Sequence, residues 1–130
     1  MLIYVCCAGG ITSSLFASKI KDAATQNNVA ITDIFTAMKE PELEETHDFV
    51  LAYGPIELFS HNRANNFIKE IDIILICPQV RYLEENTKKA VFRYNPDCYI
   101  SSLDIKLFGT MDGAKVFENL LTIIDSIKKS

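Results

Sequence analysis

The chain has 130 residues, a formal net charge of −4 and a hydrophobic share of 48%. That length fits a single domain over residues 1–130 with a core of ordinary size. The acidic balance argues against a nucleic-acid-binding protein, and no apolar run reaches the roughly 18 residues that a membrane span requires. The N-terminus lacks a basic, cleavable signal pattern, so we expect a cytoplasmic protein without direct membrane insertion.

The first part of the chain predicts a strand, a helix and a second strand. Residues 2–6 form a short apolar run, and apolar residues at helical spacing follow from near Ser13 to the asparagine pair at residues 27–28. A second strand is expected within residues 29–35. Strands that alternate with helices are typical of an α/β fold.

The second half of the chain repeats this alternation. Residues 72–76 are continuously apolar after the first of them, as expected for a parallel strand buried on both faces. A helix is predicted over residues 79–93, a short strand over residues 98–101, and a last helix from near Asp112, which would cap it. Apolar residues three and four apart give this last helix one face for the sheet: Ala114, Phe117, Leu120, Leu121, Ile124 and Ile127.

Residues 36–69 have a less regular pattern. Residues 39–45 are rich in glutamate and predict a solvated loop or a short acidic turn, and residues 49–53 predict another short strand. Two placements fit that strand: an edge of the sheet, or a hairpin with the second strand. Apolar residues indicate one further helix in this segment: Leu58, Phe59, Phe67 and Ile68.

We expect these elements to form a three-layer α/β/α fold of the flavodoxin-like type. The sheet would be mainly parallel and four-stranded in the order 2-1-3-4, with an extended segment between strands 2 and 3. The loops after parallel strands gather on the carboxyl edge, and the ligand crevice belongs between strands 1 and 3. Cys7 ends strand 1 and residues 77–81 leave strand 3, so both lead to this crevice.

Cys7 is the candidate reactive residue. It lies between the first strand and a glycine-containing loop at residues 8–14, directly before the first helix. The backbone N–H groups of such a loop and the positive end of the helix dipole can bind an anion and stabilise a thiolate beside it. We therefore expect Cys7 to be nucleophilic at neutral pH and to carry or attack a phosphoryl group.

Low-molecular-weight tyrosine phosphatases and the related arsenate reductases also use a cysteine in such a loop, on a similar fold. An arginine just before the last serine of their loop holds the phosphoryl group, and here that position is Ser13. Those enzymes also use an aspartate in a late Asp-Pro pair, whereas residues 95–97 read Asn-Pro-Asp. Without the arginine, water is poorly directed and a phosphocysteine can persist, which favours a phosphoryl carrier over a hydrolase.

The chain resembles enzyme IIB of the lactose/cellobiose (chitobiose) class of the bacterial sugar phosphotransferase system (PTS). The resemblance is carried by four stretches of sequence: residues 3–15, 18–19, 72–81 and 109–113. The spacing from the second stretch back to the loop puts Cys7, rather than Cys6, at the family's phosphorylated cysteine.

The resemblance implies a protein-N(π)-phosphohistidine–sugar phosphotransferase component, for which no cofactor or metal ion is expected. Cys7 would accept the phosphoryl group from a phosphohistidine of enzyme IIA and pass it to a sugar bound by the membrane-embedded enzyme IIC. The protein would then be cytoplasmic and peripheral to the membrane through its contact with enzyme IIC. The loop would bind the phosphoryl oxygens: Ala8, Gly9, Gly10, Ile11, Thr12, Ser13 and Ser14. A second group is expected to flank the crevice, with Arg81 either contacting phosphate or solvated: Pro78, Gln79, Arg81 and Tyr82.

The remaining cysteines and the two histidines are interpreted as structural. Cys6, Cys77 and Cys98 belong to apolar runs, and no C-x-x-C pair indicates a zinc ribbon or a thioredoxin-type motif. His47 and His61 have no partner at metal-ligand spacing, so both are expected at the surface.

Two other functions are compatible with the sequence: a stand-alone phosphatase or arsenate-reductase-like enzyme, and a regulatory binding module that keeps the fold without the transfer activity. Ser13 in place of arginine argues against the first of these. Failure of Cys7 to accept phosphate from any enzyme IIA would indicate the second.

Overall fold

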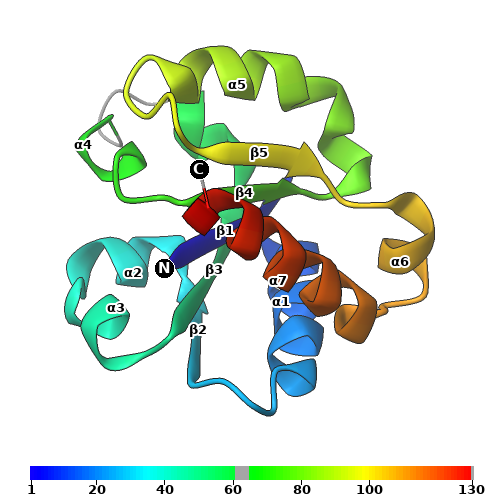
Figure 1. Ribbon diagram of the computed structural model, residues 1–130. Helices are drawn as coiled ribbons and strands as arrows, with labels where there is room; N and C mark the ends of the chain where they lie inside the picture. The colour runs from blue at the N-terminus through cyan, green and yellow to red at the C-terminus, as the bar shows by residue number, and fades with distance from the viewer. Residues whose placement is uncertain (61–64, 130) are drawn as a thin grey trace.

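A five-stranded parallel sheet with helices on both faces forms the centre of the computed structural model, which describes residues 1–60 and 65–129 (Figure 1). The strand order is β2-β3-β1-β4-β5, and all four neighbouring pairs are parallel. The strands are β1 (Leu2–Cys7), β2 (Val29–Asp33), β3 (Phe49–Pro55), β4 (Ile73–Ile76) and β5 (Tyr99–Ser102). The predicted α/β/α fold with a parallel sheet is confirmed.

The number of strands and the place of β3 differ from the prediction. The four predicted strands keep their predicted order, here β2, β1, β4 and β5, but β3 lies between β2 and β1 and pairs in parallel with both. The predicted number of four strands and the direct pairing of the first two were therefore wrong. Both placements considered for residues 49–53, the edge and the hairpin, were wrong as well. The reason lies in burial: residues 49–52 are buried, as in a strand with a neighbour on each side, whereas every residue of β2 is half-buried, as at an edge.

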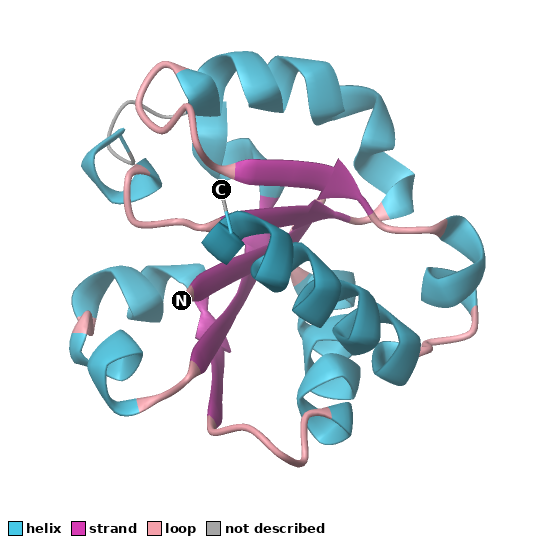
Figure 2. Cartoon of the chain, in the orientation of Figure 1, coloured by secondary structure: helices cyan, strands magenta, loops and turns pink. Residues whose placement is uncertain are grey.

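The side chains of the strands alternate between two apolar cores, one on each face of the sheet. Ile3, Val5 and Cys7 of β1 face the first core, while Tyr4 and Cys6 face the second. The first core is covered by α1 (Ile11–Ala23), α6 (Ile105–Gly109) and α7 (Gly113–Lys129). The second is covered by α2 (Ile34–Lys39), α3 (Glu42–Thr46), α4 (Asn65–Ile68), α5 (Glu84–Phe92) and two 3₁₀ helices, η1 (Ile56–Ser60) and η3 (Pro78–Leu83) (Figure 2).

Several helix boundaries depart from the predicted ones. α1 begins at Ile11 rather than near Ser13, because Gly10 in the left-handed conformation provides its N-cap. It ends at Ala23 rather than at residues 27–28. The N–H group of Ala24, the residue after the helix, donates a hydrogen bond to the Lys21 carbonyl oxygen. The helix predicted over residues 79–93 is divided into η3 and α5 at Leu83, whose φ of −93° and ψ of 1° are not helical, and η3 itself has a non-helical residue at Val80.

The glutamate-rich segment forms helices instead of only a loop. α2 is capped by Asp33, whose side chain accepts a hydrogen bond from the Thr36 N–H, and α3 follows directly after Pro41. The described residues of the helix expected from Leu58 to Ile68 belong to η1 and α4, and residues 61–64 between them lie outside the described residues. The predicted cap of the last helix is confirmed, because Asp112 accepts a hydrogen bond from the Lys115 N–H at 3.0 Å.

None of the helices in the described parts of the chain has the length and apolar character that a membrane crossing needs.

Candidate functional site

Cys7 is the last residue of β1 and lies at the carboxyl edge of the sheet, flanked by β3 and β4. β1 and β4 are neighbours, as predicted for the strands on either side of the crevice. The Cys7 side chain is 3% exposed, and the next two residues, Ala8 and Gly9, are exposed. The sulfur atom therefore lies just beneath the surface of the loop.

The loop after Cys7 owes its shape to two successive glycines. Gly9 and Gly10 have φ angles of +79° and +87°, a left-handed conformation that other residues adopt only with strain. A Cβ atom on Gly10 would lie 3.2 Å from the Gly54 Cα atom, so a side chain there would require the backbone of β3 to shift. These glycines turn the chain so that α1 starts directly behind Cys7.

The N-terminus of α1 is directed at the Cys7 sulfur. The Ser13 N–H, in the first turn of α1, donates a hydrogen bond to Cys7 Sγ at 3.3 Å. The N-terminal end of a helix carries a partial positive charge and free N–H groups, both of which favour an anion. The arrangement therefore suits a thiolate or a phosphoryl group on this sulfur.

The Ser13 side chain is completely buried beside Cys7. Its hydroxyl lies 3.0 Å from the Gly10 carbonyl oxygen and 3.4 Å from that of Gly54, and accepts a hydrogen bond from the Cys7 thiol at 3.4 Å. Ser13 thus connects the reactive cysteine, the glycine turn and the end of β3. The adjacent Ser14 hydroxyl turns away and donates to the Ile11 carbonyl oxygen at 2.7 Å.

The second predicted group follows β4 on η3. Pro78 is buried, Gln79 and Arg81 are exposed, and the Tyr82 side chain is 75% exposed. Arg81 and Tyr82 line an open depression of about 530 Å³ that continues to residues 102–105 after β5. Cys7 does not line this depression, and no contact found within residues 1–60 and 65–129 joins Arg81 to Cys7.

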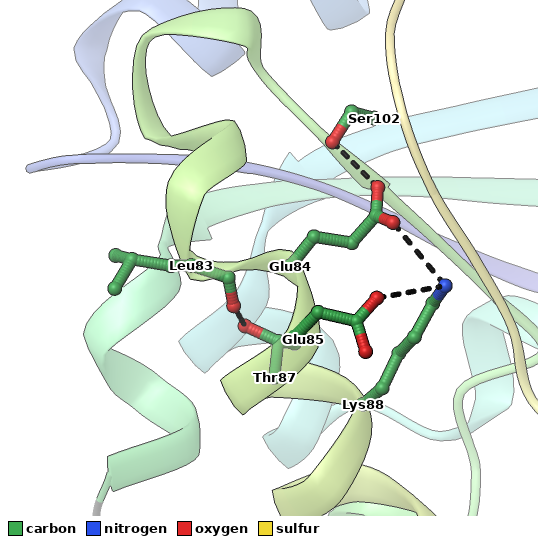
Figure 3. A network of polar contacts seen from close by, with 6 residues as sticks. All are labelled: Leu83, Glu84, Glu85, Thr87, Lys88 and Ser102. Atoms are coloured by element: carbon green, nitrogen blue, oxygen red, sulfur yellow. Dashed lines mark hydrogen bonds and ion pairs between the residues drawn. The ribbon is translucent and has the colours of Figure 1, made fainter.

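A polar network holds the segment after β4 against the end of β5 (Figure 3). Glu84 accepts a hydrogen bond from the Ser102 hydroxyl at 2.7 Å and forms an ion pair with Lys88 at 3.2 Å. Thr87 donates to the Leu83 carbonyl oxygen one turn earlier. The hydrogen bond from Ser102, supported by Lys88, lowers the pKa of Glu84, so the carboxylate is the favoured form.

The other three cysteines are free and buried, which confirms their interpretation as core residues. Burial raises the pKa of both Cys77 and Cys98 to about 12 and that of Cys6 well above its usual value. For Cys77 the neighbouring Cys7 adds to the shift. The sequence predicts that Cys7 and residues 77–81 meet at one crevice, but the interpretation of Cys77 as a core residue alone does not consider an interaction between the two thiols.

His47 is half-buried at the end of α3, where its Nδ1 atom lies 3.0 Å from both the Thr46 hydroxyl and the Leu43 carbonyl oxygen. It is therefore part of a helix end rather than an isolated surface residue. His61 lies outside the described residues. No group of three His, Cys, Asp or Glu side chains suited to a metal ion occurs in the part of the chain that the structure describes.

Comparison with known proteins identifies the family. Residues 2–119 match the family described as "PTS system, Lactose/Cellobiose specific IIB subunit". The chain belongs to this family. This IIB subunit is therefore a component of the sugar phosphotransferase system, as the sequence resemblance predicts.

Two relatives show how far the similarity extends. The IIB subunit is 24% identical over 122 residues to the "PTS system oligo-beta-mannoside-specific EIIB component" of Bacillus subtilis (strain 168), a match that covers 94% of both chains. Its fold is similar to that of the lactose-specific IIB component domain of the phosphoenolpyruvate:carbohydrate phosphotransferase system from Streptococcus pneumoniae. That comparison has a TM-score of 0.60 and 16% sequence identity and covers 94% of this chain and 95% of the other.

Proposed function

We propose that this IIB subunit is a phosphoryl carrier in which Cys7 accepts a phosphoryl group from a phosphohistidine of enzyme IIA. Phosphocysteine then donates the group to a sugar bound by the membrane protein enzyme IIC, which brings the subunit to the cytoplasmic face of the membrane. The observation that supports this most directly is the hydrogen bond of 3.3 Å from the Ser13 N–H, at the N-terminus of α1, to Cys7 Sγ.

The chemistry requires two displacements at phosphorus. The Cys7 thiolate attacks the phosphorus atom of phosphohistidine, so that an S–P bond forms, the P–N bond breaks and the histidine nitrogen leaves with the bond's electron pair. A sugar hydroxyl then attacks the same phosphorus, which breaks the S–P bond, returns the thiolate and releases the hydroxyl proton to a base. Backbone N–H groups of residues 8–14 would bind the phosphoryl oxygens and stabilise their charge in both steps.

The environment of Ser13 supports a carrier rather than a phosphatase. In the related phosphatase loops an arginine in this position binds the phosphoryl group, whereas the Ser13 side chain here is completely buried beneath the loop. A guanidinium group at this position would have to displace the contacts with Gly10 and Gly54. Without such a group, the transition-state charge has only the backbone N–H groups to stabilise it and an attacking water is poorly directed, so phosphocysteine is expected to persist until a sugar accepts the phosphoryl group.

Intact-mass spectrometry tests this proposal. The protein is incubated with phosphoenolpyruvate, enzyme I, the phosphocarrier HPr and a panel of enzyme IIA proteins. We expect the gain of one phosphoryl mass, lost in Cys7→Ser and kept in Cys6→Ser, whose side chain lies on the opposite face of β1. A mass gain that persists in Cys7→Ser, or steady hydrolysis of a phosphomonoester that requires Cys7, would overturn the proposal.

A further inference from the structure

Cys7 and Cys77 occupy opposite positions at the carboxyl ends of two neighbouring strands. β1 and β4 are parallel with Cys6 opposite Ile76, and the Cys77 N–H donates a hydrogen bond to the Cys6 carbonyl oxygen at 2.9 Å. This hydrogen bond completes the pair Cys6–Ile76, and the residues that follow this pair on the two chains are Cys7 and Cys77. Neighbouring strands lie about 4.8 Å apart, which is within the Cα–Cα range of about 4.4–6.8 Å that disulfides span.

The side chains of both residues point to the same face of the sheet. Cys7 and Cys77 belong to the apolar core beneath α1 and α7, together with Leu75 and Phe16. The Cys77 side chain is completely buried, and Cys7 lies close enough to contribute to the raised pKa of its thiol. The two side chains therefore share one core at the same edge of the sheet.

We propose that Cys7 and Cys77 form a reversible disulfide when a hydroperoxide oxidises the protein, and that this modification blocks phosphoryl transfer. The formation of the disulfide rests on the geometry of the two strands alone. Its effect on transfer rests on the proposed function of Cys7.

The oxidation is a two-electron reaction in two steps. The Cys7 thiolate attacks one peroxide oxygen, which breaks the O–O bond, forms a sulfenic acid on Cys7 and releases hydroxide or, with a proton, water. The Cys77 sulfur then attacks the Cys7 sulfur, an S–S bond forms, and the hydroxyl group leaves as water with the Cys77 proton. In total two thiols and one hydrogen peroxide give one disulfide and two waters.

The proton balance of the second step follows from the protonation state of Cys77. Burial and the adjacent Cys7 raise the pKa of Cys77 to about 12, so it starts as a thiol and passes its proton to the departing hydroxyl group as the S–S bond forms. Cys7 is the sulfur that meets the oxidant first, because the exposed Ala8 and Gly9 lie directly beside it while Cys77 is fully enclosed.

The other two cysteines are not placed to compete. Cys6 precedes Cys7 but its side chain lies in the core on the opposite face of the sheet. Cys98 belongs to that same opposite core and lies directly before β5, at the amino edge. Variants of these two residues therefore serve as matched controls that change a buried thiol without changing the proposed pair.

The first test treats the reduced, unphosphorylated protein with hydrogen peroxide and follows its intact mass and its peptides without reduction. We expect the loss of two hydrogens and a cross-link between the peptides that contain Cys7 and Cys77. Cys6→Ala and Cys98→Ala should retain the cross-link, and Cys77→Ala and Cys7→Ser should lose it. The proposal is overturned if no cross-link forms in the wild type, or if it survives in Cys77→Ala or Cys7→Ser.

The second test measures phosphoryl gain before and after oxidation, with dithiothreitol treatment as the final step. We expect peroxide to abolish the phosphoryl gain and dithiothreitol to restore it, and phosphorylated protein to resist formation of the cross-link. If the reduced protein is phosphorylated but never cross-links, this inference falls and the proposed function stands. If it cross-links but no donor phosphorylates it, the disulfide stands and both the proposed function and the inhibitory role fall.

Discussion

Ser13 and Ser14 are adjacent in sequence, but only the Ser13 hydroxyl is enclosed next to Cys7. Ser13→Ala removes the hydroxyl that lies between the carbonyl oxygens of Gly10 and Gly54. We expect the free energy of unfolding to fall by about 1–2 kcal/mol and phosphorylation of Cys7 to slow, because the loop loses its tie to β3. Chemical denaturation and the rate of mass gain measure the two effects.

Ser14→Ala is the control for that variant. Among the described residues, the hydrogen bond of its hydroxyl goes to the Ile11 carbonyl oxygen in the first turn of its own helix. The free energy of unfolding should change by no more than about 0.5 kcal/mol. Equal effects of the two substitutions on phosphorylation would contradict the role given to Ser13.

Gly9 and Gly10 allow a similar matched comparison. Both have positive φ, so alanine at either position should cost about 1 kcal/mol of stability through backbone strain. Only at Gly10 does the added methyl group meet backbone, 3.2 Å from the Gly54 Cα atom, whereas nothing lies within 4 Å at Gly9. Gly10→Ala should therefore lower the free energy of unfolding more than Gly9→Ala, as measured by urea denaturation; the reverse order would contradict the close approach of loop and β3.

At this scale the sequence predicts the loop well, because its features are local. A strand end, two glycines and a helix start occur within a few residues of Cys7, and their order alone indicates an anion-binding turn. The position of Cys77 beside Cys7 and the burial of Ser13 depend on strand register and on β3. Neither is determined by residues adjacent in sequence.

The packing of α7 against α1 depends on the first residue of α7. A Cβ atom on Gly113 would lie 2.2 Å from the Lys19 carbonyl oxygen of α1. Gly113→Ala should therefore force the two helices apart and lower the free energy of unfolding by about 3 kcal/mol. Thermal or urea unfolding measures this loss.

Gly109→Ala provides the matched control, since no atom lies within 4 Å of the added methyl group at the end of α6. Its effect should stay within about 0.5 kcal/mol. A loss as large as that of Gly113→Ala would mean that the α1–α7 contact is not the cause.

The bond between Glu84 and Ser102 should make stability depend on pH. The hydrogen bond from Ser102 lowers the pKa of Glu84 in the folded protein. This bond therefore stabilises the fold fully above the pKa of about 4.3 that the carboxyl group has in the unfolded chain. The stabilisation disappears as the pH falls through the lower pKa of the folded protein. Ser102→Ala should cost about 1 kcal/mol at pH 7, and less once Glu84 is protonated. Urea denaturation at neutral and acidic pH measures the difference.

Ser101→Ala is the neighbouring control on the same strand. No hydrogen bond of its side chain is found among the described residues, so its substitution should not change the pH dependence. A constant difference between Ser102→Ala and the wild type at all pH values would contradict the assigned role of Glu84.

The elements that the sequence failed to place are those decided by tertiary contacts. α6 has five residues and is too short to show a clear helical period in the sequence. Its start is fixed by Asp104, whose side chain accepts hydrogen bonds from the N–H groups of Lys106 and Leu107. β3 was predicted to exist, but its place in the sheet was not. A usable signal is its similarity to β4: residues 48–55 and 72–78 both read as aspartate, an apolar run and proline, and both strands flank β1.

The whole sheet should show a gradient of stability from its centre to the β2 edge. β1 is hydrogen-bonded on both sides and completely buried, whereas β2 has one partner and is half-buried throughout. We expect amide hydrogens of β1 to exchange only with global unfolding and those of β2 to exchange faster. Native-state hydrogen exchange measures both, and equal protection of the two strands would contradict this gradient.

The general architecture follows from the sequence because alternation of strands and helices is repeated over the whole chain. The position of β3 does not follow, since a parallel strand can enter the sheet on either side of its predecessor after a crossover of similar length. Here the connection from β1 to β2 leaves a gap that β3 later fills. Only the burial of β3 on both faces distinguishes this order from one with β3 at the edge.

The insertion of β3 between two earlier strands affects how the protein can fold during synthesis. A ribosome delivers β1 first and β2 second, yet these two strands share no ladder, and β2 is paired only with β3 among the described strands. A nascent chain that ends before Phe49 therefore has no pair of strands to join. Vectorial folding of the sheet has to wait for β3, whose arrival completes two ladders at once and brings the Gly54 carbonyl oxygen to Ser13.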